Sequence, residues 1–307
     1  METTLHVLME GLIDYAGLFP PASLDMPAAV RNYAGYAGSA QAAWLGRFIL
    51  PVSGLGEFSK AAAGLGPSAD WRLSALVRSG LADGTDLAAD LLTIAAFNRD
   101  AGDRRDGAPP ARRARIDSIE LKAERAEYIE AAMARMPTGL TAYFEIPIQE
   151  DPAPLLAAIA KRGARAKVRT GGVTDALFPS PALVARFLSA CARAGVPFKA
   201  TAGLHHPIRS ARPLTYAPDS PKAMMHGFLN VFLAAAFAAE GMDAETLADL
   251  LREESPRALD FGRDEVVWKG HRLPASRLRK VRRDLALAFG SCSFEEPRED
   301  LMEANFL

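Results

Sequence analysis

Short apolar runs alternate with longer stretches rich in alanine and leucine along most of the chain. The short runs have the period-two alternation and the β-branched or aromatic residues that are typical of strands. We predict strands at residues 12–16, 47–52, 72–77, 118–123, 142–147, 166–170 and 198–202, and a last one at 265–269 or 288–293. Helical patterns lie between them at residues 27–36, 57–63, 86–99, 125–136, 152–162, 181–194 and 221–240.

The boundaries of two predicted helices carry a local signal. Ser180-Pro181 and Ser220-Pro221 each place a serine where it can cap the first free N–H groups and a proline where it costs no hydrogen bond. We therefore expect helices to begin at both prolines.

The repeated strand-then-helix order predicts an α/β fold, a (β/α)₈ TIM-type barrel. An open doubly wound sheet is disfavoured because no GxGxxG turn occurs, and the absence of GxxxxGK[ST] argues against a P-loop. We expect residues 1–307 to form one barrel domain. Residues 241–283, with a hairpin at 261–271 and a basic helix at 276–283, are an insertion or a cap within it. Residues 102–115 combine glycine, proline and charge, which predicts an exposed loop.

Composition narrows the class of protein. Of the 307 residues, 49% are hydrophobic and 24% charged, which supports a large core and excludes a disordered chain. The net charge of −1 argues against nucleic acid as the main ligand. The two cysteines form no CxxC pattern, which suits a reducing compartment. No apolar run approaches the roughly 18 residues of a membrane span, and the N-terminal residues do not resemble a signal peptide. We therefore expect a cytoplasmic protein. Whether it forms a homo-oligomer is left open.

Four consecutive predicted strands carry charges on a single face. Residues two apart share a face of a strand, so Glu120 and Lys122 lie opposite Ile119 and Leu121. The same alternation sets further charges apart from their apolar neighbours, at Glu145, Lys167, Arg169 and Lys199. In a barrel these faces look into the lumen. There the charges either form a structural ion-pair network or, being late in their strands, assemble an active site.

Lys199 is the candidate for covalent chemistry. In a water-poor lumen beside Lys167 or Arg169, its pKa would be lowered and its amine would become nucleophilic toward a carbonyl. This arrangement resembles that of class I aldolases, in which a lysine on a late barrel strand attacks a carbonyl; the resemblance covers a lysine near a strand end and no longer motif. Glu145, Glu120 or Lys122 would then carry protons at the same mouth.

Two glycine-containing turns are candidate anion sites. Lys167, Arg169 and the backbone of Thr170-Gly171-Gly172 form a potential cradle for an oxyanion, or a plain turn in which the glycines supply positive φ. Ser291 precedes a predicted helix at 295–303 and either helps to bind an anion or belongs to an ordinary helix cap. Asp14, in the predicted loop after the first strand, is expected to reach the same mouth.

Three of the five histidines follow the Lys199 strand closely, at His205, His206 and His226. One of them is a candidate general acid or base, with His226 near bound substrate. Alternatively, two of them bind a divalent metal with Glu145, although no HExxH spacing is present. Hydrogen-bonded structural histidines are the third interpretation. Residues 207–220 contain three prolines and are a candidate lid.

The sequence thus predicts a lyase or isomerase that acts on a small phosphorylated or carboxylated carbonyl compound, without a cofactor. Two alternatives stay open. One is a metal-dependent barrel enzyme that uses His205, His206 and His226. The other is a non-catalytic barrel that binds a small molecule.

Overall fold

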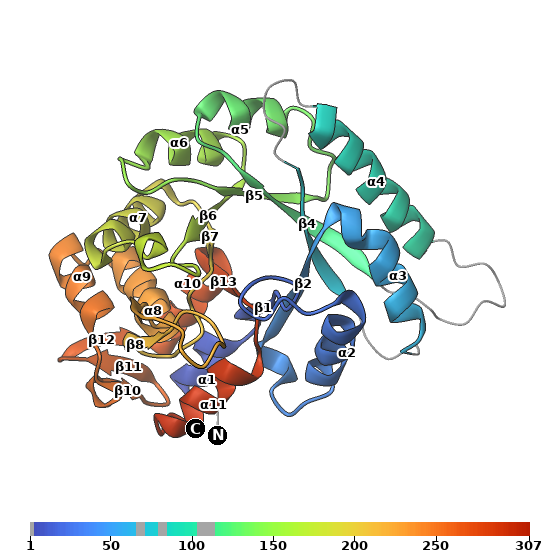
Figure 1. Ribbon diagram of the computed structural model, residues 1–307. Helices are drawn as coiled ribbons and strands as arrows, with labels where there is room; N and C mark the ends of the chain where they lie inside the picture. Colours follow the sequence, from blue (N-terminus) through green and yellow to red (C-terminus); the bar gives the residue numbers. More distant parts are fainter. Residues whose placement is uncertain (1–2, 66–70, 79–84, 103–113) are drawn as a thin grey trace.

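Eight parallel strands close into a barrel that is surrounded by helices (Figure 1). The computed structural model describes residues 3–65, 71–78, 85–102 and 114–307. Around the barrel the strand order is β1-β13-β7-β6-β5-β4-β3-β2, and every neighbouring pair is parallel. The predicted (β/α)₈ TIM-type barrel is therefore confirmed.

The strands of the barrel agree with the predicted ones to within a few residues. They are β1 (Ile13–Tyr15), β2 (Leu45–Pro51), β3 (Arg72–Leu76), β4 (Arg115–Lys122), β5 (Thr141–Glu145), β6 (Arg165–Arg169), β7 (Phe198–Thr201) and β13 (Ala286–Ser291). Of the two candidates for the last strand, the second is correct.

Helices cover the outside of the barrel. They are α1 (Thr4–Met9), α2 (Met26–Ala37), α3 (Leu55–Ala63), α4 (Thr85–Gly102), α5 (Ala126–Met133), α6 (Ala153–Lys161), α7 (Pro181–Ala194), α8 (Phe228–Ala239), α9 (Ala244–Arg252), α10 (Ala275–Asp284) and α11 (Glu295–Glu303). Short 3₁₀ helices are η1 (Ala42–Trp44), η2 (Val52–Gly54), η3 (Asp175–Leu177) and η4 (Pro256–Ala258). None of the described helices is long and apolar enough to cross a bilayer.

The apolar faces of the strands pack outward against these helices. On β7, Phe198 contacts Phe187 of α7 and Phe232 of α8, with ring centroids 5.5 and 6.2 Å apart. Val168 of β6 and Ala200 of β7 are likewise fully buried. Because side chains alternate along a strand, this packing turns the charged positions of the same strands toward the lumen.

The predicted helix at 221–240 is wrong in its first part. Residues 210–225 form an antiparallel hairpin of β8 (Ser210–Pro213) and β9 (Lys222–Met225), and α8 begins only after Gly227. The exposed and buried positions of β9 alternate, which is a strand period. Ser220 consequently caps no helix, and its hydroxyl accepts a hydrogen bond from the backbone N–H of Thr215 at 2.9 Å. The Ser180 cap is confirmed by its contact with the N–H of Leu183.

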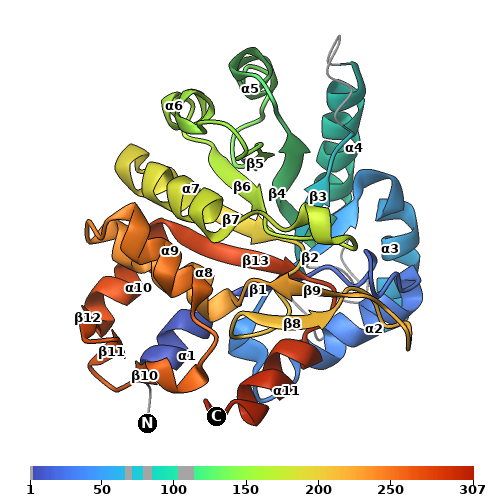
Figure 2. The same ribbon diagram turned by 60° about the vertical axis from the view of Figure 1, so that its left-hand side comes forward.

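The segment between α8 and β13 lies beside the barrel (Figure 2). It contains α9, which the sequence pattern did not predict, and a three-stranded antiparallel sheet of β10 (Leu259–Phe261), β11 (Glu265–Trp268) and β12 (His271–Pro274). The predicted hairpin is thus part of a larger sheet, and the basic helix is α10. The predicted loop at 102–115 lies, apart from its ends, outside the described residues.

Candidate active site

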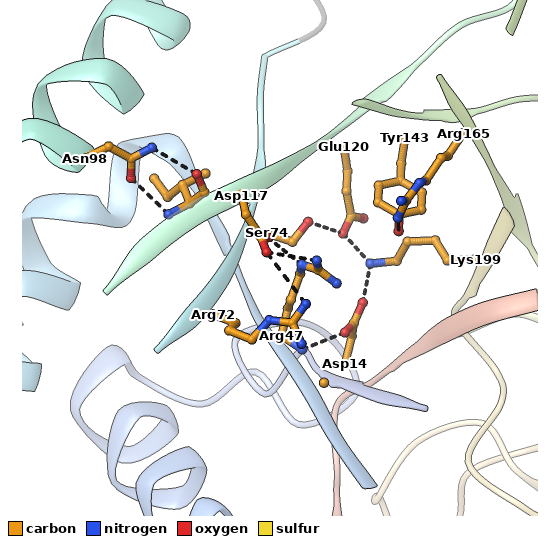
Figure 3. Close-up of polar contacts among 12 residues, drawn as sticks. Asp14, Arg47, Arg72, Ser74, Asn98, Asp117, Glu120, Tyr143, Arg165 and Lys199 are labelled. Carbon is orange, nitrogen blue, oxygen red and sulfur yellow. Dashed lines mark hydrogen bonds and ion pairs between the residues drawn. The ribbon is translucent and has the colours of Figure 1, made fainter. Parts of the chain in front are cut away.

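A buried lysine joins two carboxylates at the centre of the barrel. Lys199 Nζ of β7 lies 2.6 Å from Asp14 Oδ2 of β1 and 2.6 Å from Glu120 Oε1 of β4 (Figure 3). The lysine side chain is only 2% exposed. Asp14 belongs to strand β1 rather than to the loop that follows it, so its carboxylate points into the lumen instead of the mouth.

The chain of charges continues toward the mouth. Lys167 Nζ of β6 lies 2.8 Å from the other oxygen of Glu120 and 2.9 Å from Glu145 Oε2 of β5. Arg169 Nε then lies 3.2 Å from Glu145 Oε1, and its side chain is 43% exposed. Cations and carboxylates therefore alternate from the buried lysine to the solvent.

Neutral groups hold the two innermost carboxylates in place. The Ser74 hydroxyl of β3 donates to Glu120 Oε1 at 2.8 Å, and the backbone N–H of Arg47 donates to Asp14 Oδ1 at 2.6 Å. Both carboxylates are thus fixed from two sides, as a preorganised site requires.

Tyr143 of β5 completes the surroundings of the buried lysine. Its ring centroid lies 5.2 Å from Lys199 Nζ, within the range of a cation–π contact, and its hydroxyl accepts a hydrogen bond from Arg165 Nη1 at 2.8 Å. The sequence analysis did not select Tyr143, although it lies two residues before Glu145 on the same strand face.

These contacts reverse one prediction. Burial alone would lower the pKa of Lys199, but the charges of Asp14 and Glu120 outweigh it and raise that pKa above its usual value. Lys199 is thus an ammonium in this arrangement, and the predicted lowered pKa is wrong. Lys167 and Arg169 do not reverse this upward shift of the pKa. Glu120 lies between Lys167 and Lys199, and Glu145 pairs with both Lys167 and Arg169.

The carboxylates are shifted in the opposite sense. Burial would raise the pKa of Glu120, but Lys167 and Lys199 hold it well below its usual value. For Glu145, burial is likewise outweighed by Lys167 and Arg169, so its pKa is lowered. Both groups are carboxylates at neutral pH.

This shift predicts a pH dependence of stability. A carboxyl group with a lowered pKa contributes stability that is present above its unfolded-state pKa, about 4.3 for Glu, and that is lost as the pH falls through the folded-state pKa. We expect the free energy of unfolding to fall between about pH 5 and 3, and to fall less steeply in Glu120→Gln. Urea unfolding at several pH values measures both slopes, and parallel slopes would contradict the prediction.

A cavity of about 710 Å³ opens above the network at the carboxyl ends of the strands. Glu120, Glu145, Lys167 and Lys199 line it from the barrel, and residues 212–218 of the β8–β9 hairpin line it from outside. The segment predicted as a lid is therefore part of the wall of this cavity.

Cations gather where the cavity meets the solvent. Lys122 at the end of β4, Arg169 at the end of β6 and Arg212 on β8 all line it. Arg212 lies 3.5 Å from Asp300, whereas no ion-pair partner of Lys122 occurs within the described ranges. These side chains suit a negatively charged ligand at the mouth.

The three histidines differ in position. His205 and His206 line the cavity, and His206 Nδ1 pairs with Asp300 at short range. His226 is buried away from the lining, where its Nε2 lies 2.8 Å from the carbonyl oxygen of Pro179. The predicted contact of His226 with substrate is therefore not supported. Within the described part of the chain, no cluster of three or more His, Cys, Asp or Glu side chains is arranged to hold a metal ion.

Of the predicted anion cradle after β6, Lys167, Arg169 and Gly172 line the cavity, whereas Thr170 and Gly171 do not. The Thr170 hydroxyl donates to the carbonyl oxygen of Ala202 at 2.7 Å, and a Cβ on Gly171 would lie 2.4 Å from the ring of Phe178. Thr170 and Gly171 are therefore buried against neighbouring loop residues, and of this turn only Gly172 lines the cavity. The plain-turn alternative is also incorrect in detail, because neither glycine has a positive φ.

At the end of β13, Ser291 contacts a histidine instead of the cavity. Its Oγ lies 3.2 Å from His205 Nδ1, while Ser293 Oγ accepts the N–H of Glu296 at 3.1 Å near the start of α11. The helix-cap interpretation of this segment is supported by the Ser293 contact. Cys292 lines the cavity next to His205, a pairing that sequence spacing does not indicate.

Comparison of the chain with protein-family models, curated proteins and solved structures found no match.

Proposed function

We propose that this chain is a lyase or isomerase that moves a proton next to the carbonyl group of a small anionic substrate. The observation that carries this proposal is the alternating chain from Asp14 to Arg169, which ends in a cavity at the carboxyl ends of the barrel strands. In TIM barrels this end of the strands carries the active site. Buried charges are costly unless they pair or act on a ligand.

The mouth supplies the anchor for the substrate. Lys122, Arg169 and Arg212 offer positive charge to a carboxylate or phosphate group. Binding of that group by Arg169 draws the guanidinium away from Glu145, which then keeps only Lys167 as a cationic partner. Glu145 becomes a stronger base as a result.

The inner lysines act on the carbonyl oxygen. As ammonium groups, Lys167 and Lys199 donate hydrogen bonds that stabilise the negative charge which develops when Glu145 removes a proton from the adjacent carbon. Glu120 fixes both lysines with its two oxygens. This acid–base route needs no neutral amine in the resting site.

A second route is favoured by the position of the two lysines on neighbouring strands. Lys167 and Lys199 are register partners on β6 and β7, so a carbonyl carbon held between them lies close to both amines. An imine would form in balanced steps: one ammonium passes its proton transiently to Glu120, its nitrogen adds to the carbonyl carbon to give a carbinolamine, and Glu120 returns the proton as the former carbonyl oxygen leaves as water, with the other lysine retaining its positive charge.

A thermal-shift screen of carboxylated and phosphorylated carbonyl compounds, followed by turnover assays of the hits, tests the proposal. We expect at least one compound that both stabilises the protein and is converted. Borohydride added to that mixture then separates the routes, because it fixes an imine as a mass increase on Lys167 or Lys199. Stabilisation without turnover for every hit would contradict the enzyme and favour a non-catalytic binding barrel. Loss of turnover on chelation would favour the metal alternative.

A further inference from the structure

A cysteine and a histidine meet in the wall of the cavity, apart from the lysine network. Cys292 Sγ, directly after β13, lies 3.9 Å from His205 Nδ1. Both side chains line the cavity, and 87 residues of chain separate them. None of the steps proposed above uses this pair.

Further polar groups surround the sulfur. The Tyr216 hydroxyl of the β8–β9 loop lies 3.6 Å from Cys292 Sγ. Glu296 of α11 is the acidic neighbour, with Oε2 3.5 Å from His205 Nδ1 and 3.3 Å from the Tyr216 oxygen. The thiol thus lies beside a hydroxyl and an imidazole, and Glu296 approaches the same imidazole nitrogen as the sulfur does.

These contacts make the two cysteines of the chain chemically different. Burial raises the pKa of Cys292, but the hydrogen bond and charge of His205 outweigh it and lower that pKa below the usual value. Cys191, on α7, is fully buried among apolar groups, and burial raises its pKa well above the usual value. One thiol faces a cavity beside a base and the other is enclosed.

We propose that Cys292 and His205 form a thiol–imidazole pair that captures the carbonyl carbon of a small anionic aldehyde as a reversible hemithioacetal. The proposal identifies the carbonyl substrate of the proposed lyase or isomerase as an aldehyde, and this assignment of the substrate rests on the proposed function. Thiols add to aldehydes far more readily than to ketones. The cations Lys122, Arg169 and Arg212 of the same cavity select for the negative charge.

The addition is balanced without an oxidant or reductant. The Cys292 thiol gives its proton to His205 Nδ1, and the sulfur forms a bond to the carbonyl carbon as the C=O π bond opens. The carbonyl oxygen then takes the proton from His205, and the Tyr216 hydroxyl, 3.6 Å from the sulfur, would donate a hydrogen bond to it. Reversal of the same steps releases the aldehyde.

Alkylation by iodoacetamide, followed by peptide mapping, tests the reactive thiol. At about pH 6.5, well below the pKa of about 8.5 of a free thiol, we expect Cys292 of the folded protein to be labelled at least about tenfold faster than Cys191. His205→Gln should slow the labelling of Cys292 about tenfold, whereas His271→Gln, at an exposed position of β12, should leave it unchanged. Equal labelling of the two cysteines, or no effect of His205→Gln, would overturn the pair.

Glyoxylate, a small carboxylate with an aldehyde group, tests the capture itself. We expect it to slow the labelling of Cys292 in the wild-type chain and in Lys199→Arg, with acetate, which lacks the aldehyde, having no effect. Equal protection by acetate, or none by glyoxylate, would overturn the aldehyde assignment. That failure is distinguishable from a failure of the proposed function, which the turnover and borohydride assays measure at the lysines. An imine, unlike a hemithioacetal, is fixed by borohydride.

Discussion

The Lys199→Met variant is expected to lose about 3–5 kcal/mol of unfolding free energy. The substitution removes the ammonium that lies 2.6 Å from both Asp14 and Glu120, and it leaves two buried carboxylates with fewer partners. A buried charge that has lost its partner is far more destabilising than the loss of a surface pair. Urea unfolding at neutral pH, followed by tryptophan fluorescence, measures the change.

A surface ion pair provides the matched control. Lys161 lies 2.9 Å from Glu130, and their side chains are 67% and 41% exposed, so Lys161→Met should cause a far smaller loss. Adding Asp14→Asn to Lys199→Met should restore part of the lost stability, because the uncompensated charge is then removed. A loss in Lys199→Met no greater than that in Lys161→Met would show that the buried chain of charges does not stabilise the fold.

Glu145→Gln is expected to lower kcat about 10²- to 10⁴-fold for the substrate that the screen identifies, which is the usual contribution of a positioned general base. Glutamine keeps the size of the side chain, but it cannot take a proton and it removes the charge that pairs with Lys167 and Arg169. The contacts of Glu145 with Lys167 and Arg169 make it the carboxylate next to the mouth, where the substrate enters. Steady-state kinetics of the purified variant measure the effect.

Two comparisons make this result specific. Glu130→Gln, on the exposed face of α5, should leave kcat unchanged. Arg169→Met should raise KM, because Arg169 is proposed to hold the anionic group of the substrate. If Glu145→Gln retained kcat within about twofold, far below the contribution of a general base, Glu145 would not be the base.

Much of the barrel was predictable because it depends on local periodicity. The alternation in 118–123 and 142–147 placed Glu120 and Glu145 opposite apolar neighbours, and the structure places both in the lumen. The first residues of the predicted helix at 221–240 were misassigned because their alanine and methionine residues suit either element. Only the hairpin partner of residues 222–225 shows them to be a strand.

The roles of single residues were less predictable because they depend on partners distant in the chain. Asp14 and Lys199 are 185 residues apart, and they meet because β1 and β7 both flank β13. Thr170 and Gly171 follow a charged strand, as the residues of a ligand-binding turn would. In the structure they pack against neighbouring loop residues and do not line the cavity. Nothing in the spacing of Cys292 and His205 indicates their contact.

The positions of the first seven barrel strands, and the division of the four charged strands into an inward polar and an outward apolar face, were determined by the amino-acid sequence alone. These features follow from backbone geometry within a few residues. The tertiary structure decided which charges pair, and therefore that Lys199 is an ammonium rather than a free amine. A pKa depends on the groups that closure of the barrel brings within a few ångströms, and for Lys199 these come from β1 and β4, which are distant from it in the chain.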